Sequence, residues 1–257
     1  MKMIMRHEDK YICTNRQLDL IEARLSSFLK RDSHQVGSDY GIRSLYFDTF
    51  EDRLLNESLS GVPNRKKYRI RIYNCSDERI SLEEKSSVGN LKSKRSAVVT
   101  QEYVKEQLGS VVSGEYVREC SQDPQIGKSA LYTSNSAAPD LLTTVHLLNR
   151  TEGLRPVVIV DYRRSAYIYD IGNVRITIDK DIGASAQFED FFNPGMITLP
   201  VLENNKNLIE VKYDGILPGF IVRLLDIGSM EHVSFSKYAL CRNVMENNGR
   251  RDEYYVI

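Results

Sequence analysis

The sequence predicts an α+β protein in which an antiparallel sheet curls into a β-barrel tunnel with a charged lumen and helices packed outside. Several segments alternate between apolar and charged residues, as in "KYRIRIY", where Lys67, Arg69 and Arg71 share one face of a strand. Other segments carry apolar residues at helical spacing and therefore need an apolar surface to cover. If these helices cover the apolar face of the sheet, its charged face points inward when the sheet curls.

The first half of the chain predicts helices between strands. A helix over about 15–30 can begin at Thr14 or Asn15, because either side chain can cap its first turn. The sequence "FEDRLLNESL" predicts a short helix that ends before Gly61. Alternation or strand-forming residues predict strands at 4–13, 42–49, 66–73 and 79–86. The last two of these strands are joined by a hairpin turn at "NCSDE".

The second half begins with "VTQEYVKEQL", which predicts a helix capped by Thr100. The cap is weak, because Tyr103 occupies the position at which a capping box has glutamate. Residues 109–140 place Ser, Gly, Asp and Pro between short apolar runs and predict loop with helical turns. We find no repeat or linker and expect a single domain over 1–257. Further helices are predicted at 138–150, at 217–227 and after Ser236. Further strands are predicted at 156–169, 173–180 and 208–214.

The charged face recurs on most of these strands. The ordinary explanation is a sheet with one face in the core and the other in water. Solvent faces, however, usually mix Ser, Thr, Gln and both charge signs, whereas arginine and lysine dominate here. Besides the face described above, the shared faces hold Arg6, Glu8 and Lys10; Arg79, Glu83 and Lys85; Arg175, Thr177 and Asp179; and Glu210, Lys212 and Asp214.

A lumen lined by such cations would repel itself strongly unless an anion filled it. Arginine suits phosphate because its planar fork binds two oxygens, and lysine adds a compact positive charge. Carboxylates cannot bind phosphate directly, but they can hold a hard cation that bridges to it. The pattern therefore predicts a site for a metal-bound polyanion.

Short pieces of the sequence also occur in the order of a known family: "RHEDKY", "SLYFDT", "KYRIRIY", "SLEEK", "YRRSAY", "VRITID", "IEVKYD" and "SFSKY". From Arg6 to Tyr238 the chain resembles the catalytic domain of the vacuolar transporter chaperone (VTC) polyphosphate polymerases. That domain belongs to the CYTH-like, or triphosphate tunnel metalloenzyme, superfamily. The resemblance implies an eight-stranded antiparallel tunnel that binds triphosphate or ATP with Mg²⁺ or Mn²⁺.

The resemblance also implies roles for individual residues. Glu210, in "IEVK", matches the metal-binding glutamate, and Glu8 is a second candidate. Arg163 could replace Arg164, since "YRRSAY" offers adjacent arginines, and Lys94 is a further candidate for the tunnel. The positions that match phosphate contacts are Lys10, Arg69, Arg71, Lys85, Arg164, Arg175, Lys212 and Lys237.

One departure from the family bears on the activity. Arg6 stands where the superfamily often has the first glutamate of a Glu-x-Glu-x-Lys pattern. One metal carboxylate is thereby missing, which fits the polymerase branch and counts against a simple triphosphatase. We expect a phosphotransferase of the polyphosphate polymerase type, which moves the γ-phosphoryl group of ATP onto a polyphosphate chain. The alternatives are an inorganic triphosphatase or other CYTH-type activity, and a non-catalytic module that binds polyphosphate or triphosphate.

Composition limits the partners and the compartment. Lys+Arg and Asp+Glu both number 35, so the formal net charge is zero and a long nucleic acid is disfavoured. The four cysteines are far apart and favour a reducing compartment. With no signal peptide or long apolar window, we expect a cytoplasmic location, with any membrane association through a separate membrane protein partner.

Overall fold

The computed structural model of the chain describes residues 6–33, 35, 37–89, 91–112, 138–234 and 236–253. The prediction of loop with helical turns at 109–140 falls mainly on 113–137, which lie outside the described residues. At the edges of this range, one helix ends at Val112 and the next begins at Ala138.

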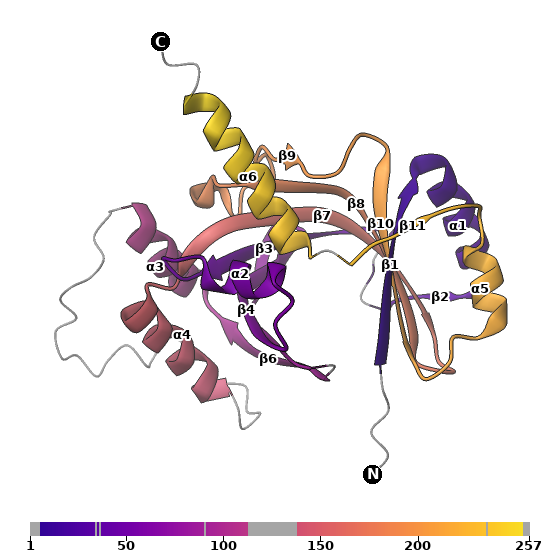
Figure 1. Cartoon of the computed structure of the whole chain (residues 1–257), viewed down its shortest axis with the longest axis horizontal. Coiled ribbons are helices and arrows are strands. Elements are labelled where there is room, and N and C mark those ends of the chain that lie inside the picture. The colour runs from indigo at the N-terminus through magenta and orange to yellow at the C-terminus, as the bar shows by residue number, and fades with distance from the viewer. Residues whose placement is uncertain are drawn as a thin grey trace. The chain divides into compact units, whose positions relative to one another are not determined.

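Helices are interspersed among the strands along the described chain (Figure 1). The helices are α1 (Asn15–Phe28), α2 (Arg53–Leu59), α3 (Gln101–Val112), α4 (Ala138–Glu152), α5 (Gly219–Leu225) and α6 (Lys237–Glu253), with a short 3₁₀ helix at Phe188–Asp190. The strands are β1 (Arg6–Thr14), β2 (Lys30–Arg31), β3 (Tyr40–Asp48), β4 (Asn64–Tyr73), β5 (Ser76–Val88), β6 (Leu91–Val99), β7 (Arg155–Tyr169), β8 (Val174–Ser185), β9 (Leu199–Pro200), β10 (Lys206–Asp214) and β11 (Glu231–His232).

The strands form an 11-stranded sheet with the order β11-β1-β10-β8-β7-β3-β4-β5-β6, in which β2 also pairs with β7 and β9 with β8. The pairings of β1 with β10, β10 with β8, β3 with β4, and β5 with both β4 and β6 are antiparallel. The α+β class and a mostly antiparallel sheet are therefore confirmed. Among the described residues no pairing joins the two ends of this order, so the eight-stranded closed barrel is not confirmed.

The chain divides into two compact units, each assembled from separate stretches of sequence. Strands β3, β7, β8 and β9 contribute residues to both units. The prediction of a single domain remains a prediction. Unit 1 consists of Met1–Gly41, Tyr162–Gly183 and Pro200–Phe235, and unit 2 of Ile42–Asp161, Ala184–Leu199 and Ser236–Ile257.

In unit 1, helices α1 and α5 pack on the apolar face of β8 and β10. Ile21 of α1 and Ile221 of α5 share a core with Ile176 of β8 and Ile209 of β10, and all four are 0% exposed. Burying one such side chain contributes roughly 1.5–3 kcal/mol. Since side chains alternate along a strand, the residues next to Ile176 in β8 and next to Ile209 in β10 point to the opposite face of the sheet.

Unit 2 is built in the same way. Leu45 of β3, Ile70 of β4 and Leu82 of β5 pack against Val104 of α3 and Leu141 of α4, all of them 0% exposed. The helices again cover the apolar face, which leaves the charged face on the other side of these strands, as the sequence predicts. None of the helices formed by the described residues is long and apolar enough to cross a membrane.

Each predicted helix and strand overlaps an element of the structure, but one long strand, three two-residue strands and the 3₁₀ helix were not predicted. Helix α1 begins with the expected cap: Thr14 Oγ1 accepts a hydrogen bond from the Gln17 backbone N–H, and the Gln17 side chain accepts one from the Thr14 N–H. Sequence reasoning missed β6, because "LKSKRSAVV" is polar over most of its length. Its strand conformation depends on continuous antiparallel pairing with β5 from Ile80 to Val88.

Candidate functional site

In unit 1 the predicted residues of neighbouring strands lie on one face. Antiparallel pairing places Lys10 of β1 opposite Glu210 of β10, and Glu8 opposite Lys212. Lys212 in turn lies opposite Arg175 of β8. Opposite residues on antiparallel strands have Cβ atoms roughly 4.5–5.5 Å apart, so these side chains are close neighbours. We define the unit 1 cluster as Glu8, Lys10, Arg164, Arg175, Glu210 and Lys212.

The two carboxylates predicted to bind metal lie among lysines. Glu8 is 3.1 Å from Lys10 Nζ and 3.6 Å from Lys212 Nζ. Glu210 is 3.3 Å from Lys212 Nζ and 4.0 Å from Lys10 Nζ. Both lysines therefore contact both carboxylates. Because a lysine has a flexible stem and a compact charge, it can turn to another anion when a ligand arrives.

The adjacent arginines of "YRRSAY" have different environments. Arg164 donates hydrogen bonds to both carboxylate oxygens of Asp179, at 2.6 and 2.7 Å, and lies over the Tyr162 ring. Burial disfavours the charged guanidinium, but the charge of Asp179 outweighs it and raises the pKa of Arg164. Arg163 instead pairs with Asp39, and its side chain is 57% exposed, compared with 11% for Arg164. Arg164, which also lies 4.0 Å from Glu210, is therefore the arginine that joins the unit 1 cluster.

In unit 2 the pairing of β3, β4 and β5 gathers a second set of residues. Arg69 of β4 lies opposite Tyr46 of β3 and Glu83 of β5. On the same face, Lys67 lies opposite Lys85. We define the unit 2 cluster as the predicted residues Arg69, Arg71, Lys85 and Lys237, together with Lys67, Glu83 and Lys94.

Arg69 is held on both sides within this cluster. Its Nε donates to Glu83 at 2.7 Å, and an Nη donates to the Tyr46 hydroxyl at 2.9 Å. Lys94 Nζ donates to the other oxygen of Glu83 at 3.1 Å. Burial alone would raise the pKa of Glu83, but the charges of Arg69, Arg71 and Lys94 outweigh it and lower that pKa to about 2. The expectation of strong self-repulsion without a ligand is thus wrong for Arg69, since a buried carboxylate offsets its charge.

The remaining lysines of β4, β5 and β6 are less enclosed. Lys85 lies directly opposite Lys67 on one side and Lys94 on the other, so like charges adjoin across the strands. Such pairs are destabilising. Arg71 donates from Nε to the hydroxyl of Ser44, a neutral partner, at 3.1 Å. Lys94, the neighbour of Lys85 on β6, also pairs with Glu83.

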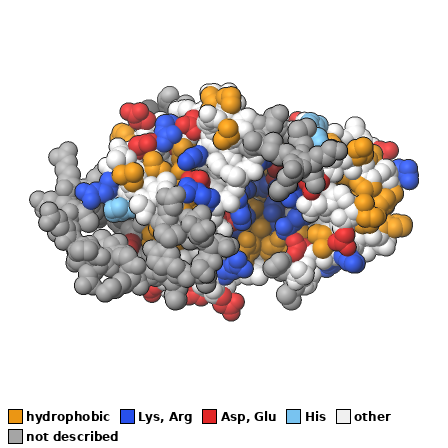
Figure 2. All heavy atoms as spheres, turned by 90° about the horizontal axis from the view of Figure 1, so that it is seen from below, with side chains coloured by type: hydrophobic (Ala, Val, Ile, Leu, Met, Phe, Trp, Pro, Cys, Tyr) orange, Lys and Arg blue, Asp and Glu red, His pale blue; other side chains and the backbone are white. Residues whose placement is uncertain are grey.

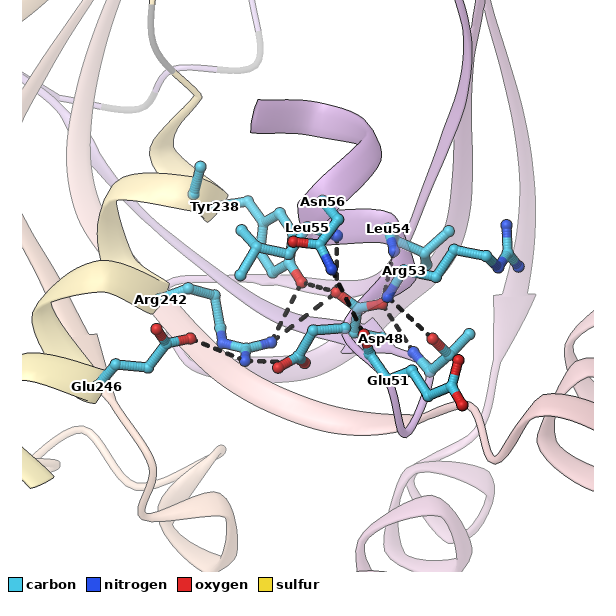
Figure 3. A network of polar contacts seen from close by, with 12 residues as sticks. Asp48, Glu51, Arg53, Leu54, Leu55, Asn56, Tyr238, Arg242 and Glu246 are labelled. Atoms are coloured by element: carbon cyan, nitrogen blue, oxygen red, sulfur yellow. Dashed lines mark hydrogen bonds and ion pairs between the residues drawn. The ribbon is translucent and has the colours of Figure 1, made fainter. Parts of the chain in front are cut away.

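Lys237 is the first residue of α6, and a buried polar network fixes the start of this helix. The hydroxyl of Tyr238 donates to the carboxylate of Asp48, which is 0% exposed (Figure 3). The same carboxylate accepts hydrogen bonds from the backbone N–H groups of Leu54 and Leu55, at 2.8 and 2.9 Å. Asp48 thereby ties the end of β3, the beginning of α2 and the beginning of α6 together.

Tyr238 also reaches the unit 2 cluster directly. Its ring stacks on Tyr46 with the centroids 5.0 Å apart, and Lys67 Nζ lies 5.8 Å from the ring centre. Lys67 Nζ donates to the hydroxyl of Ser236 at 2.9 Å. Sequence reasoning missed this anchor, because "SLYFDT" and "SFSKY" contain its residues but nothing in the pattern links them.

The acidic residues of unit 1 are chemically suited to a divalent metal ion. Among the described residues, no group of three or more His, Cys, Asp and Glu side chains forms a metal site. Mg²⁺ in phosphate-handling sites, however, usually takes one or two carboxylates and completes its shell with water and substrate phosphate. Glu210 and Glu8 offer such a pair of oxygen donors, both in contact with the same two lysines.

Charges of both signs lie on the face of the molecule that Figure 2 draws, and the formal net charge is zero. Figure 2 shows blue Lys and Arg side chains and red Asp and Glu side chains on the same face. The cationic character of the two clusters is therefore a local property of the strands that carry them.

Comparison with solved structures gave matches of low similarity. The PH1819 protein of Pyrococcus horikoshii OT3 is 14% identical, with 94% of this chain and 99% of that chain covered and a TM-score of 0.44. A Bacillus halodurans protein provisionally assigned as an adenylate cyclase is 12% identical, with 91% and 94% covered and a TM-score of 0.48. A conserved Pyrococcus furiosus protein is also 12% identical, with 86% and 85% covered and a TM-score of 0.38.

Comparison with families is more informative. A search of curated protein sequences gave no significant match. The sequence profile of the VTC domain, however, matches residues 5–246, which include every residue of the two clusters. The chain therefore belongs to the VTC domain family.

Proposed function

We propose that this protein is a metal-dependent phosphotransferase that moves the γ-phosphoryl group of ATP onto a polyphosphate chain. Its membership of the VTC domain family supports this function. The observation that carries the proposal is the unit 1 cluster, in which Glu8 and Glu210 lie among cations on a sheet face. In a module that only binds polyanions, carboxylates beside these lysines would repel phosphate without fixing an arginine as Asp179 fixes Arg164.

Phosphoryl transfer depends mainly on positioning and charge stabilisation, so the protein needs no nucleophile of its own. In the proposed mechanism the cations of each cluster bind phosphate oxygens and hold the transferring group in line. Arginines held by a carboxylate present their remaining N–H donors in a fixed orientation, which favours bidentate contacts. The proposed phosphate contacts are Lys10, Arg164, Arg175 and Lys212 in unit 1, and Arg69, Arg71, Lys85 and Lys237 in unit 2.

Glu210, with Glu8 as a second ligand, would hold Mg²⁺ or Mn²⁺. When bound, such an ion offsets the negative charge of the phosphates and acts as a Lewis acid towards them. Lys10 and Lys212 would then exchange their carboxylate contacts for phosphate oxygens. Closure of the sheet into an eight-stranded tunnel, a cytoplasmic location and a separate membrane protein partner belong to the same proposal.

Product analysis tests the function. The purified protein is incubated with ATP and either Mg²⁺ or Mn²⁺, and the products are separated into orthophosphate, cyclic nucleotide and longer phosphate chains. Polyphosphate formed together with ADP is the expected result. Orthophosphate alone, also from inorganic triphosphate, would establish a triphosphatase instead, and binding without turnover would establish a binding module.

A further inference from the structure

Two buried side-chain polar atoms of the described residues lack a hydrogen-bond partner: Nε of Arg175 and Oγ1 of Thr177. Both residues belong to β8 and are two positions apart, so their side chains lie on the same face roughly 7 Å from each other. Thr177 is only 3% exposed. A buried hydroxyl without a partner is unfavourable, because it has lost its hydrogen bonds to water.

Folding alone gives no reason for a hydroxyl at this position. Valine has nearly the shape of threonine, is an equally good strand former and carries no polar atom to satisfy. The contacts of the neighbouring side chains are with other groups: Arg175 reaches Asp32 with an Nη at 2.8 Å, and Asp179 holds Arg164. The hydroxyl of Thr177 is therefore suited to a group that binds to the folded protein.

The surroundings indicate the chemistry of that group. Thr177 lies directly opposite Glu210, and Arg175 lies opposite Lys212. Arg164 is 4.0 Å from Glu210 on the same face. Cations thus flank the hydroxyl, and an acceptor with several negative oxygens would satisfy both the hydroxyl and the Nε–H of Arg175.

We propose that Thr177 is a substrate-contact residue whose hydroxyl donates a hydrogen bond to a phosphoryl oxygen, beside an oxygen bound by Nε of Arg175. The ligand class is an inorganic triphosphate or a longer polyphosphate. This inference rests on the proposed function in one respect only, namely that the unit 1 cluster binds phosphate chains. It does not depend on transfer, hydrolysis or the metal ion.

The test compares Thr177→Val with Thr177→Ser. Calorimetric titration with inorganic triphosphate in EDTA measures affinity without metal, and thermal denaturation measures the stability of the ligand-free protein. Thr177→Val should bind triphosphate about tenfold more weakly, since one hydrogen bond to a charged acceptor is lost. Its melting temperature without ligand should be unchanged or higher. Thr177→Ser keeps the hydroxyl and should bind like the wild type.

Ser165→Ala is the matched control, because Ser165 is 1% exposed but its hydroxyl donates to Glu22 at 2.9 Å. This variant should lose stability and keep its affinity. Unchanged affinity of Thr177→Val for triphosphate would overturn the inference and would indicate that a bound water satisfies the hydroxyl. A lower melting temperature of ligand-free Thr177→Val would also overturn it, since the hydroxyl would then serve folding. If the wild type itself binds no triphosphate, the proposed function fails, and the inference fails with it.

Discussion

The two clusters share one arrangement. In unit 1, Asp179 holds Arg164, and in unit 2, Glu83 holds Arg69. Each carboxylate belongs to a neighbouring strand, and each guanidinium lies over a tyrosine ring, with its central carbon 5.2 Å and 5.7 Å from the ring centre, respectively. An arginine that is fixed in this way loses little conformational freedom when it binds phosphate.

The clusters differ in which cations contact their glutamates. Glu8 and Glu210 of unit 1 contact Lys10 and Lys212, whose charges are carried on flexible stems. In unit 2, Glu83 is bound by a rigid arginine fork and has a lowered pKa. One alternating pattern thus provides carboxylates that fix arginines and carboxylates that contact lysines, and we propose that only the second kind exchanges its cations for a metal ion.

Among the variants that test this difference between the clusters, Glu210→Gln should have the largest effect on activity. Turnover of ATP should fall at least about 100-fold, because charge stabilisation by a metal ion is worth several kcal/mol. Metal-free triphosphate should bind as well as to the wild type, or better, since one negative charge is removed. Steady-state kinetics and calorimetry in EDTA measure the two quantities.

Glu203→Gln is the control for this prediction, because the Glu203 side chain is 80% exposed and contacts Lys206. It should behave like the wild type in both assays. Normal turnover by Glu210→Gln would show that another residue holds the metal ion.

A second variant examines the fixed pair of unit 2. Arg69→Ala should lower the free energy of unfolding by about 3 kcal/mol, because it leaves the buried carboxylate of Glu83 without its main partner. Denaturant unfolding measures this change. Lys94→Ala should cost less than about 1 kcal/mol, since the Lys94 side chain is 53% exposed. The double variant Arg69→Ala/Glu83→Ala should recover part of the loss, and strict additivity would refute the coupling.

The same pair predicts a dependence of stability on pH. The pKa of Glu83 is lowered from 4.5 to about 2, so the folded protein favours the ionised carboxylate. This contribution, roughly 3 kcal/mol, is fully present above pH 4.5 and is lost as the pH falls towards 2. Denaturation at a series of acidic pH values should show the loss, and Glu83→Gln should reduce the slope. An unchanged slope in that variant would assign the acid sensitivity to other groups.

A smaller effect is expected at the anchor of α6 in unit 2. Tyr238→Phe removes the hydroxyl that donates to Asp48 and should lower the free energy of unfolding by about 2 kcal/mol. Tyr213→Phe is the matched control in unit 1, where the hydroxyl donates to Asp9 at a part-buried position. Its effect should be smaller than that of Tyr238→Phe. Equal losses of unfolding free energy in the two variants would show that the buried network contributes no more to stability than the part-buried hydrogen bond.

The sequence predicted which residues share a face, and much of the fold follows from that. The alternation in β4 places Arg69 and Arg71 on the face opposite Ile70, as the structure has it. Helix α1 was predictable because its apolar spacing and its Thr14 cap are both local signals. Such features depend on residues close together in the chain.

The features that the sequence did not reveal depend on distant pairing. Nothing in the pattern distinguishes Glu83, which fixes an arginine, from Glu210, which contacts lysines, because their roles depend on the strands beside them. Asp48 and Tyr238 are separated by 190 positions, so their contact has no local signature. The lack of a partner for Thr177 likewise became visible only with its neighbours in place.

The central claim is that the two clusters bind chains of phosphate, and a thermal shift measurement tests it most directly. The melting temperature of the protein is followed in EDTA at constant ionic strength, with inorganic triphosphate, with sulfate, and with chloride as the control. Triphosphate should raise the melting temperature, with a stabilisation of about 2.7 kcal/mol at 100 times the dissociation constant, and concentrated sulfate should reproduce part of the shift. No shift with either anion would contradict the claim and would mean that the charged faces serve only to keep the sheet in water.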